Sequence, residues 1–236
     1  MTSSDDAPDD APDNANASVA EGPGFHYARI RRRLTELLAT LDDEAWNQPT
    51  ECCPGWRVRD VLGHLAGTVE DAMAGRLTGP PSDAQTAEQV DRHRTEDPRV
   101  VLAGWNASAP AFEDVITQFE IWPGAIDVLT HEHDIRQALG RPGARDDELM
   151  EIVAPMLVRR VDERVRLQVE AGGRTYENDA IAGPELTLRT TPFELLRVGL
   201  GRRSPDQVRA LDWSADPGTV VDALFVFGPT TVPIIE

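Results

Sequence analysis

Apolar residues recur at helical spacing from His26 to Gly140, and this period is the main structural signal in the chain. A stripe of apolar side chains between Ile30 and Leu41 defines the first helix. Further helices are expected at 57–77, 99–119 and 122–140, with a mostly polar helix at 84–96. Four principal amphipathic helices in succession predict a four-helix bundle.

Beyond Pro142 the pattern becomes mixed. Residues 166–170 and 185–190 alternate in the manner of strands, and Gly172 with Gly173 supplies a turn. The other expected elements are helices at 146–166, 191–201 and 219–227, and a strand at 208–213. We therefore predict an α+β fold class in three parts: a disordered acidic tail at 1–24, a helical bundle at 25–145 and a small α+β domain at 146–236.

The charge and the cysteines limit the classes of partner and compartment. The tail carries six acids and no base, a composition typical of disorder. The net charge of −18 argues against nucleic acid or an anionic membrane as a partner. The only cysteines, Cys52 and Cys53, are adjacent, so they form neither a disulfide framework nor a C-x-x-C metal site. Since no apolar run is long enough to span a membrane and no signal peptide is evident, we expect a cytoplasmic protein.

Asp127 and His131 interrupt the apolar stripe of the helix expected at 122–140. Their i, i+4 spacing places a carboxylate and an imidazole on one face, one turn apart, where they can hold a divalent metal. His133 is rotated by about 200° from His131 and points the other way. Ile135 stands where the second histidine of an H-E-x-x-H site would be. On this segment alone, a surface pair that stabilises the helix by a few tenths of a kcal/mol is the simpler interpretation.

His64 is the candidate for a third ligand. It lies beside the core stripe of the helix expected at 57–77, with Asp60 and Thr68 one turn to either side. A histidine at such a position is usually a hydrogen-bonded core residue. The ligand interpretation gains weight because another helix carries a matched carboxylate and imidazole. His93, between two arginines, is interpreted as solvent-exposed.

Three stretches of the chain resemble one known family. Residues 53–65, CPGWRVRDVLGHL, are similar to a C-x-G-W-x-V-x-D-x-x-x-H-L segment, and residues 127–140 to an acid-x-x-x-His-x-x-Asp run that ends in Leu-Gly. A weaker similarity covers Leu200-Gly201-Arg202. Together they resemble the mycothiol-dependent maleylpyruvate isomerase family, which has a DinB-like four-helix bundle followed by a small C-terminal domain. The resemblance spans most of residues 25–236.

The resemblance implies a metal- and thiol-dependent enzyme. It assigns a divalent metal, expected to be Zn²⁺, to His64, Asp127 and His131, although the characterised family enzyme has Glu where Asp127 stands. It assigns Arg202 to a substrate carboxylate, while a solubilising surface arginine is the alternative. Mycothiol would be the cofactor that isomerises a small electrophile from cis to trans by reversible thiol addition. A mycothiol S-transferase and a non-catalytic metal- or protein-binding module remain open.

The same resemblance suggests roles for three supporting residues. Asp60 and Asp134 would orient the ligand histidines as hydrogen-bond acceptors, or else lie in solvent as ordinary helix residues. Cys53 belongs to the family-like segment, but the reacting sulfur would come from the cofactor. We therefore expect Cys53 to be a buried structural cysteine.

Overall fold

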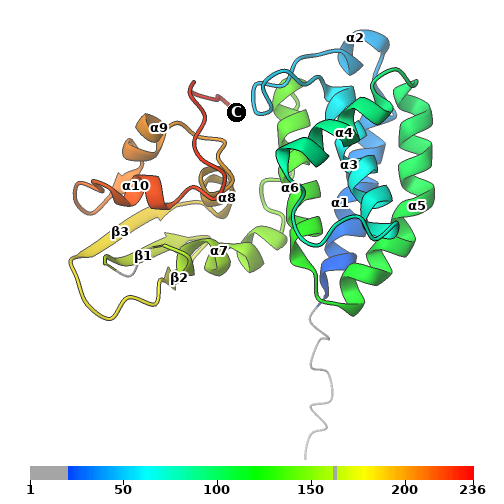
Figure 1. Ribbon diagram of the computed structural model, residues 1–236. Coiled ribbons are helices and arrows are strands. Elements are labelled where there is room, and N and C mark those ends of the chain that lie inside the picture. The colour runs from blue at the N-terminus through cyan, green and yellow to red at the C-terminus, as the bar shows by residue number, and fades with distance from the viewer. Residues whose placement is uncertain (1–20, 162–163) are drawn as a thin grey trace, which may run out of the picture.

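The computed structural model describes residues 21–161 and 164–236 (Figure 1). Most of the predicted tail at 1–24 lies outside the described residues, and the first helix begins at Pro23. The helix-rich N-terminal region contains α1 (Pro23–Leu38), α2 (Asp43–Trp46), α3 (Val58–Met73), α4 (Asp83–His93), α5 (Pro98–Gln118) and α6 (Trp122–Ala138). The C-terminal part contains α7 (Leu149–Arg159), β1 (Arg166–Ala171), β2 (Arg174–Glu177), β3 (Glu185–Thr190), α8 (Pro192–Gly199), α9 (Pro205–Arg209), β4 (Asp212–Trp213) and α10 (Val220–Ala223).

Four long helices form the core of the N-terminal region. Helix α1 packs between α5 and α6, and α3 contacts the same two helices, while the shorter α4 lies against α3. Apolar stripes on the long helices meet inside, where the largest fully buried side chains include Leu34, Leu62, Trp105, Ile116 and Leu129. The predicted succession of amphipathic helices is therefore found, and it brings α3 and α6 into contact.

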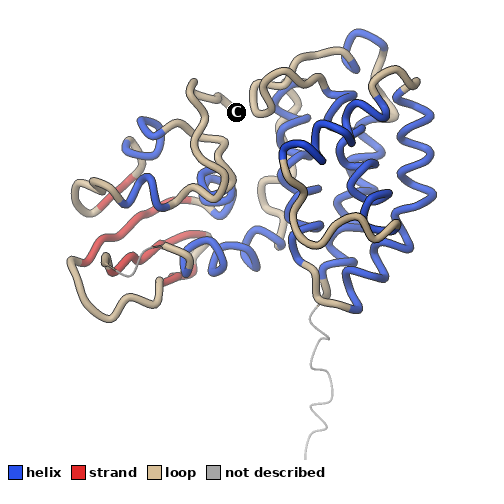
Figure 2. Tube along the Cα trace, in the orientation of Figure 1, coloured by secondary structure: helices blue, strands red, loops and turns tan. Residues whose placement is uncertain are grey.

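The strands gather in the C-terminal part (Figure 2). They form one mixed sheet in the order β2-β1-β3-β4, in which β1 and β3 are parallel and the other two pairs are antiparallel. One face of the sheet is apolar, with Leu167, Val169, Leu186 and Leu188 buried. The α+β architecture predicted from the sequence is confirmed, although β2 was not anticipated.

The prediction of a strand at 208–213 is wrong for its first half. Residues 205–209 form helix α9, because Pro205 occupies the first helical turn and Ser204 forms a reciprocal capping box with Gln207. Only Asp212 and Trp213 pair with β3. The local capping signal thus outweighs the alternating pattern. The last helix, expected at 219–227, is shorter in the structure, where α10 covers only Val220–Ala223.

A buried arginine joins the two parts of the chain. Arg197 on α8 is fully buried and donates from Nη1 to Oδ1 of Asp134 on α6, at 2.8 Å. The C-terminal segment returns to the space between the two parts (Figure 1), where the Glu236 side chain pairs with Arg197 at 2.7 Å. Among residues 21–161 and 164–236, no helix combines the length and apolar character needed to cross a bilayer.

Candidate metal centre

The structure brings the three sequence-predicted ligands together. His64 comes from α3, and Asp127 and His131 come from α6, and one ligand atom from each lies within 4.8 Å of the other two. Both imidazoles are buried, whereas Asp127 is partly exposed. The contact between α3 and α6 therefore brings His64 together with Asp127 and His131 in one cluster.

The spacing of these ligand atoms fits a metal ion. Asp127 Oδ2 lies 3.4 Å from His64 Nε2, and Asp127 Oδ1 lies 3.5 Å from His131 Nε2. Both separations are long for a hydrogen bond. Zinc bonds of about 2.1 Å arranged tetrahedrally place neighbouring ligand atoms about 3.4 Å apart. The Asp127 carboxylate therefore lies at the separation from each histidine that a shared ion requires.

The remaining nitrogen of each histidine is held by a buried acceptor. His131 Nδ1 lies 3.0 Å from Asp134 Oδ2, and His64 Nδ1 lies 2.9 Å from Gln89 Oε1. These contacts place the ring proton on Nδ1 and leave the Nε2 lone pair directed toward the cluster. Such outer hydrogen bonds are the usual support of metal-binding histidines.

Only one of the two carboxylates expected to support the histidines does so. Asp134 contacts His131, as expected. Asp60 instead accepts from the backbone N–H of Arg57 at 2.9 Å and binds its guanidinium, which closes the first turn of α3. Gln89 supports His64 in its place. The sequence pattern identified Gln89 only as part of a polar helix.

Asp134 connects the cluster to the C-terminal part. Its fully buried carboxylate pairs with Arg197 at 2.8 Å and with Arg202 at 2.8 Å. Burial by itself would raise the pKa of Asp134, but Arg202, Arg197 and the hydrogen bond from His131 hold that pKa well below its ordinary value. Asp134 is therefore an ionised acceptor between a candidate metal ligand and two arginines.

Arg202 lies next to the cluster but is not free. Its Nη2 and Nε bond the two oxygens of Asp134, at 2.8 and 3.3 Å, and Nη1 donates to the Leu200 carbonyl at 2.6 Å. Its side chain is only 14% exposed, so Arg202 is largely covered. The assignment of a substrate carboxylate to Arg202 stays a prediction.

His133 lies apart from the cluster, as the helical rotation predicted. Its ring packs edge-on against Phe193 of α8, with centroids 4.9 Å apart. Burial and then the Arg197 charge lower the pKa of His133 to about 3, so it is neutral at physiological pH. His93, which we interpreted as solvent-exposed, is instead largely covered, with a side chain only 10% exposed between Glu70 and Glu96.

Cys53, His131 and Asp134 form a second group of potential ligands. Cys53 Sγ lies 3.4 Å from Asp134 Oδ2 and 3.9 Å from His131 Nδ1. Both oxygens of Asp134 already bind arginines, and burial followed by the Asp134 charge raises the pKa of the Cys53 thiol well above its usual value. This group therefore suits a hydrogen-bonded support better than a metal site.

This distinction gives a direct prediction. Cys53→Ser should leave the metal content of the purified protein unchanged, because the thiol is not a ligand of the His64–Asp127–His131 cluster. Metal analysis of wild-type and variant protein prepared in parallel measures the effect. A variant that has lost its metal would place the ion in the cysteine-containing group instead.

Trp56 forms an aromatic wall beside the cluster. Its ring stacks near His131, with centroids 6.2 Å apart and planes inclined by 29°, and its centroid lies 5.4 Å from that of His64. The turn before it depends on Gly55, whose φ of +87° strongly favours glycine. The sequence Pro54-Gly55-Trp56 thus places an apolar surface against both histidines.

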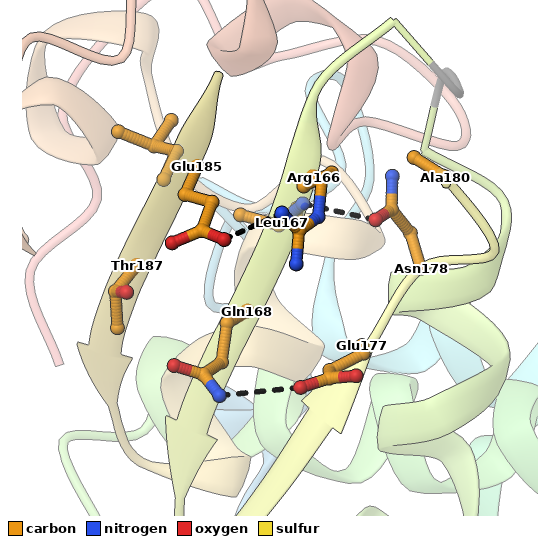
Figure 3. Close-up of a pocket in the computed structure, with 9 residues that line it drawn as sticks. Arg166, Leu167, Gln168, Glu177, Asn178, Ala180, Glu185 and Thr187 are labelled. Carbon is orange, nitrogen blue, oxygen red and sulfur yellow. Dashed lines mark hydrogen bonds and ion pairs between the residues drawn. The ribbon is translucent and has the colours of Figure 1, made fainter. Parts of the chain in front are cut away.

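Two pockets among the described residues lie away from this cluster. One, of about 160 Å³, is on the polar side of the sheet, where Arg166 pairs with Glu185 and Gln168 bonds Glu177 (Figure 3). It is lined by neither histidine nor cysteine. The other, of about 120 Å³, lies beside His133 and Phe193. Neither contains the set of side chains that metal-assisted thiol chemistry needs.

The fold and the site together define a helical domain that carries a candidate metal centre at its junction with a small α+β domain. Residues 27–136 match the family model of the mycothiol maleylpyruvate isomerase N-terminal domain. The helical region therefore contains a domain of this type, which spans a little under half of the chain. No curated protein matches the chain significantly.

Two solved structures share the fold. One is a mycothiol-dependent maleylpyruvate isomerase, which is 13% identical with a TM-score of 0.54, and the alignment covers 82% of this chain and 92% of that one. The other is a histidine-to-alanine mutant of a mycothiol-dependent maleylpyruvate isomerase, with 14% identity, a TM-score of 0.52, and coverage of 76% and 88%. The likeness extends beyond the helical domain into the C-terminal part.

Proposed function

We propose that the protein is a metal- and thiol-dependent enzyme that isomerises a small electrophile from cis to trans, with mycothiol as the thiol. The observation that carries this proposal is the convergence of His64, Asp127 and His131, each histidine with its Nδ1 held by a buried acceptor. The match of residues 27–136 to the mycothiol maleylpyruvate isomerase N-terminal domain supports the choice of thiol and of reaction.

The three side chains would hold a divalent metal, for which Zn²⁺ is the best match to two imidazoles and a carboxylate. Three protein ligands leave a fourth position open, as catalytic zinc sites require. A metal bound there stabilises a thiolate relative to its thiol and so provides a nucleophile at neutral pH. Asp127 is one methylene shorter than glutamate, but its carboxylate already lies at coordination spacing from both histidines.

The chain's own thiols are unsuited to act as the nucleophile. Burial, followed by the charge of Asp134, raises the pKa of Cys52 to about 12 and that of Cys53 well above normal. Both thiols are therefore protonated at neutral pH and poorly reactive. A second reactant has to supply the sulfur, in agreement with a dependence on a low-molecular-weight thiol.

Reversible addition accounts for the isomerisation. Addition of the thiolate to the cis double bond turns it into a single bond, rotation follows, and elimination re-forms the double bond as the trans product and releases the thiolate. Arg202 would attract an anionic substrate toward the cluster, since its positive charge lies beside Asp134 and its side chain keeps 14% of its surface exposed. Trp56 would form the apolar side of the same site and limit the access of water.

A mycothiol S-transferase uses the same residues and is the second candidate. An electrophile that cannot eliminate the thiol after addition, or that loses a leaving group, would keep the sulfur attached. The cluster activates the thiol equally for both outcomes. The geometry of the metal ligands therefore supports thiol activation, and the product analysis distinguishes isomerase from transferase.

The test is an assay on native and metal-stripped protein, each with and without mycothiol. We expect turnover of maleylpyruvate, or conjugation of a small electrophile, only when metal and thiol are both present. Re-addition of Zn²⁺ to stripped protein should restore activity. Turnover that persists after removal of the metal, or in the absence of mycothiol, would refute the proposal. Metal binding without activity on any thiol and electrophile would favour a non-catalytic module.

A further inference from the structure

Helix α4 lies outside the four long helices, yet it contributes a fully buried polar side chain to the candidate metal centre. Gln89 is 0% exposed and faces α3. Its Oε1 lies 2.9 Å from His64 Nδ1, and its Nε2 donates to Asp71 Oδ2 at 2.9 Å. The Gln89 side-chain amide therefore links His64, a candidate metal ligand, to the buried carboxylate of Asp71.

The orientation of this amide is set by Asp71. An ionised carboxylate only accepts hydrogen bonds, so the NH₂ group of Gln89 has to face Asp71. Arg76 and Arg92 donate to the other oxygen of Asp71, at 2.5 and 2.8 Å. Burial raises the pKa of Asp71, but the hydrogen bonds from Gln89 and the two arginines outweigh it and lower that pKa overall. The carbonyl oxygen of Gln89 is then the atom that faces His64.

That orientation determines which ring nitrogen of His64 carries the proton. A carbonyl oxygen accepts, so Nδ1 of His64 donates, and Nε2 keeps its lone pair. The hydroxyl of Thr68 also approaches Gln89 Oε1, at 3.4 Å, which agrees with an acceptor at this position. Nε2 is the nitrogen that faces Asp127. The tautomer is therefore the one that can bind a metal.

A glycine on α3 makes this contact possible. A Cβ atom at Gly67 would lie 2.6 Å from Gln89 Cβ and 2.8 Å from Gln89 Cγ, both too short for real side chains. Gly63, one turn earlier, would bring a Cβ within 3.3 Å of His93 Cβ. The absence of side chains at these positions lets α4 approach α3 closely, which brings the glutamine amide to His64.

We propose that Gln89 is a positioning residue that holds His64 in its metal-binding tautomer, and that Asp71 acts through it by orienting the amide. This inference rests on the proposed function, because it assigns the purpose of the network to a metal at His64, Asp127 and His131. It predicts that Asp71, which touches no ligand, influences metal binding.

The tautomer is measured on the full-length, metal-free protein. At alkaline pH, where the imidazoles are neutral, ¹⁵N chemical shifts of the His64 ring should report a proton on Nδ1 in the wild type. In Asp71→Asn the new amide can donate as well as accept, so Gln89 is free to turn its NH₂ group toward His64. We expect the proton to shift to Nε2 in a large share of molecules. A wild-type ring protonated on Nε2, or an unchanged tautomer in Asp71→Asn, would overturn the inference.

The affinity for Zn²⁺ is measured by competition with a chromophoric chelator. Gln89→Leu should bind Zn²⁺ about 10- to 100-fold more weakly than the wild type, as is usual for loss of an outer hydrogen bond. Gly67→Ala should also weaken Zn²⁺ binding, because the added methyl group pushes α4 away from α3 and so moves the Gln89 amide away from His64. Val90→Ala is the matched control: Val90 is buried on the same helix, but its side chain has no polar atom that could bond His64, so the Zn²⁺ affinity of this variant should stay within about twofold of the wild type.

The outcomes separate this inference from the proposed function. Equal Zn²⁺ affinity in Gln89→Leu and wild type would overturn the positioning role alone. Equal weakening in Gln89→Leu and Val90→Ala would reduce the role of Gln89 to packing. A wild type that takes up no Zn²⁺ would refute the proposed function, whereas the ring tautomer of His64 would still decide whether Gln89 and Asp71 control the proton.

Discussion

His131→Ala should reduce the Zn²⁺ content of the purified protein from about one ion per chain to less than about a tenth of that. Nε2 of His131 is one of three ligand atoms within 4.8 Å, and the two that remain cannot hold an ion against competition from water and buffer. His64→Ala should have the same effect. The measurement is elemental analysis after dialysis against metal-free buffer.

Two other histidines are the controls for this prediction. His133 lies two residues from His131 on the same helix and is equally buried, but its ring faces Phe193. His93 lies between two glutamates on α4. His133→Ala and His93→Ala should therefore retain the metal, even if His133→Ala lowers the stability. Full metal content in both ligand variants would show that the ion binds elsewhere.

Asp134→Ala should destabilise the folded protein by about 3–5 kcal/mol, which is the usual effect of removing one partner of a buried ion pair. It leaves Arg197, a side chain with no solvent exposure, without its main partner on α6, and Arg202 loses a bidentate acceptor. Chemical denaturation of metal-free protein measures the change in the free energy of unfolding. Working without metal separates this effect from any change in metal affinity.

Asp60→Ala is the matched control for Asp134→Ala. Asp60 is nearly as buried as Asp134, but its partner Arg57 is 36% exposed and the pair lies at a helix end. We expect a loss of about 1 kcal/mol, typical of a helix cap. Equal losses for the two variants would show that the ion pairs of Asp134 with Arg197 and Arg202 add no stability beyond that of a surface pair.

Much of the fold followed from periodicity, and so did part of the site. The i, i+4 spacing of Asp127 and His131 placed two side chains on one face because helix geometry alone determines it. His64 could be named as a candidate third ligand but not placed beside the other two, since its distance from α6 depends on how two helices cross. The rotation that separates His133 from His131 was also readable from helix geometry, and the structure agrees with it.

The hydrophobic pattern of the sequence did not identify Gln89 or Arg197 as residues that support the site. Gln89 lies in a helix with little apolar content, and its contact with His64 depends on the missing side chain at Gly67. A signal that could have pointed to it is the pair Gly63 and Gly67, four residues apart on one face of α3. Arg197 falls within an amphipathic helix, where a charged residue is normally assigned to solvent. Its burial depends on Asp134, more than sixty positions earlier in the chain.

The ion pairs of Asp134 restrict how this fold can be recombined. A chimera that keeps α6 but takes its C-terminal part from a relative would bury a carboxylate at the junction. If the donor lacks arginines at the positions of Arg197 and Arg202, that carboxylate would have no compensating charge, and His131 would lose an ionised acceptor. The N-terminal and C-terminal parts can therefore be exchanged only when the ion-pair partners of Asp134 are kept. Engineered fusions should transfer α6 together with α8 and Arg202.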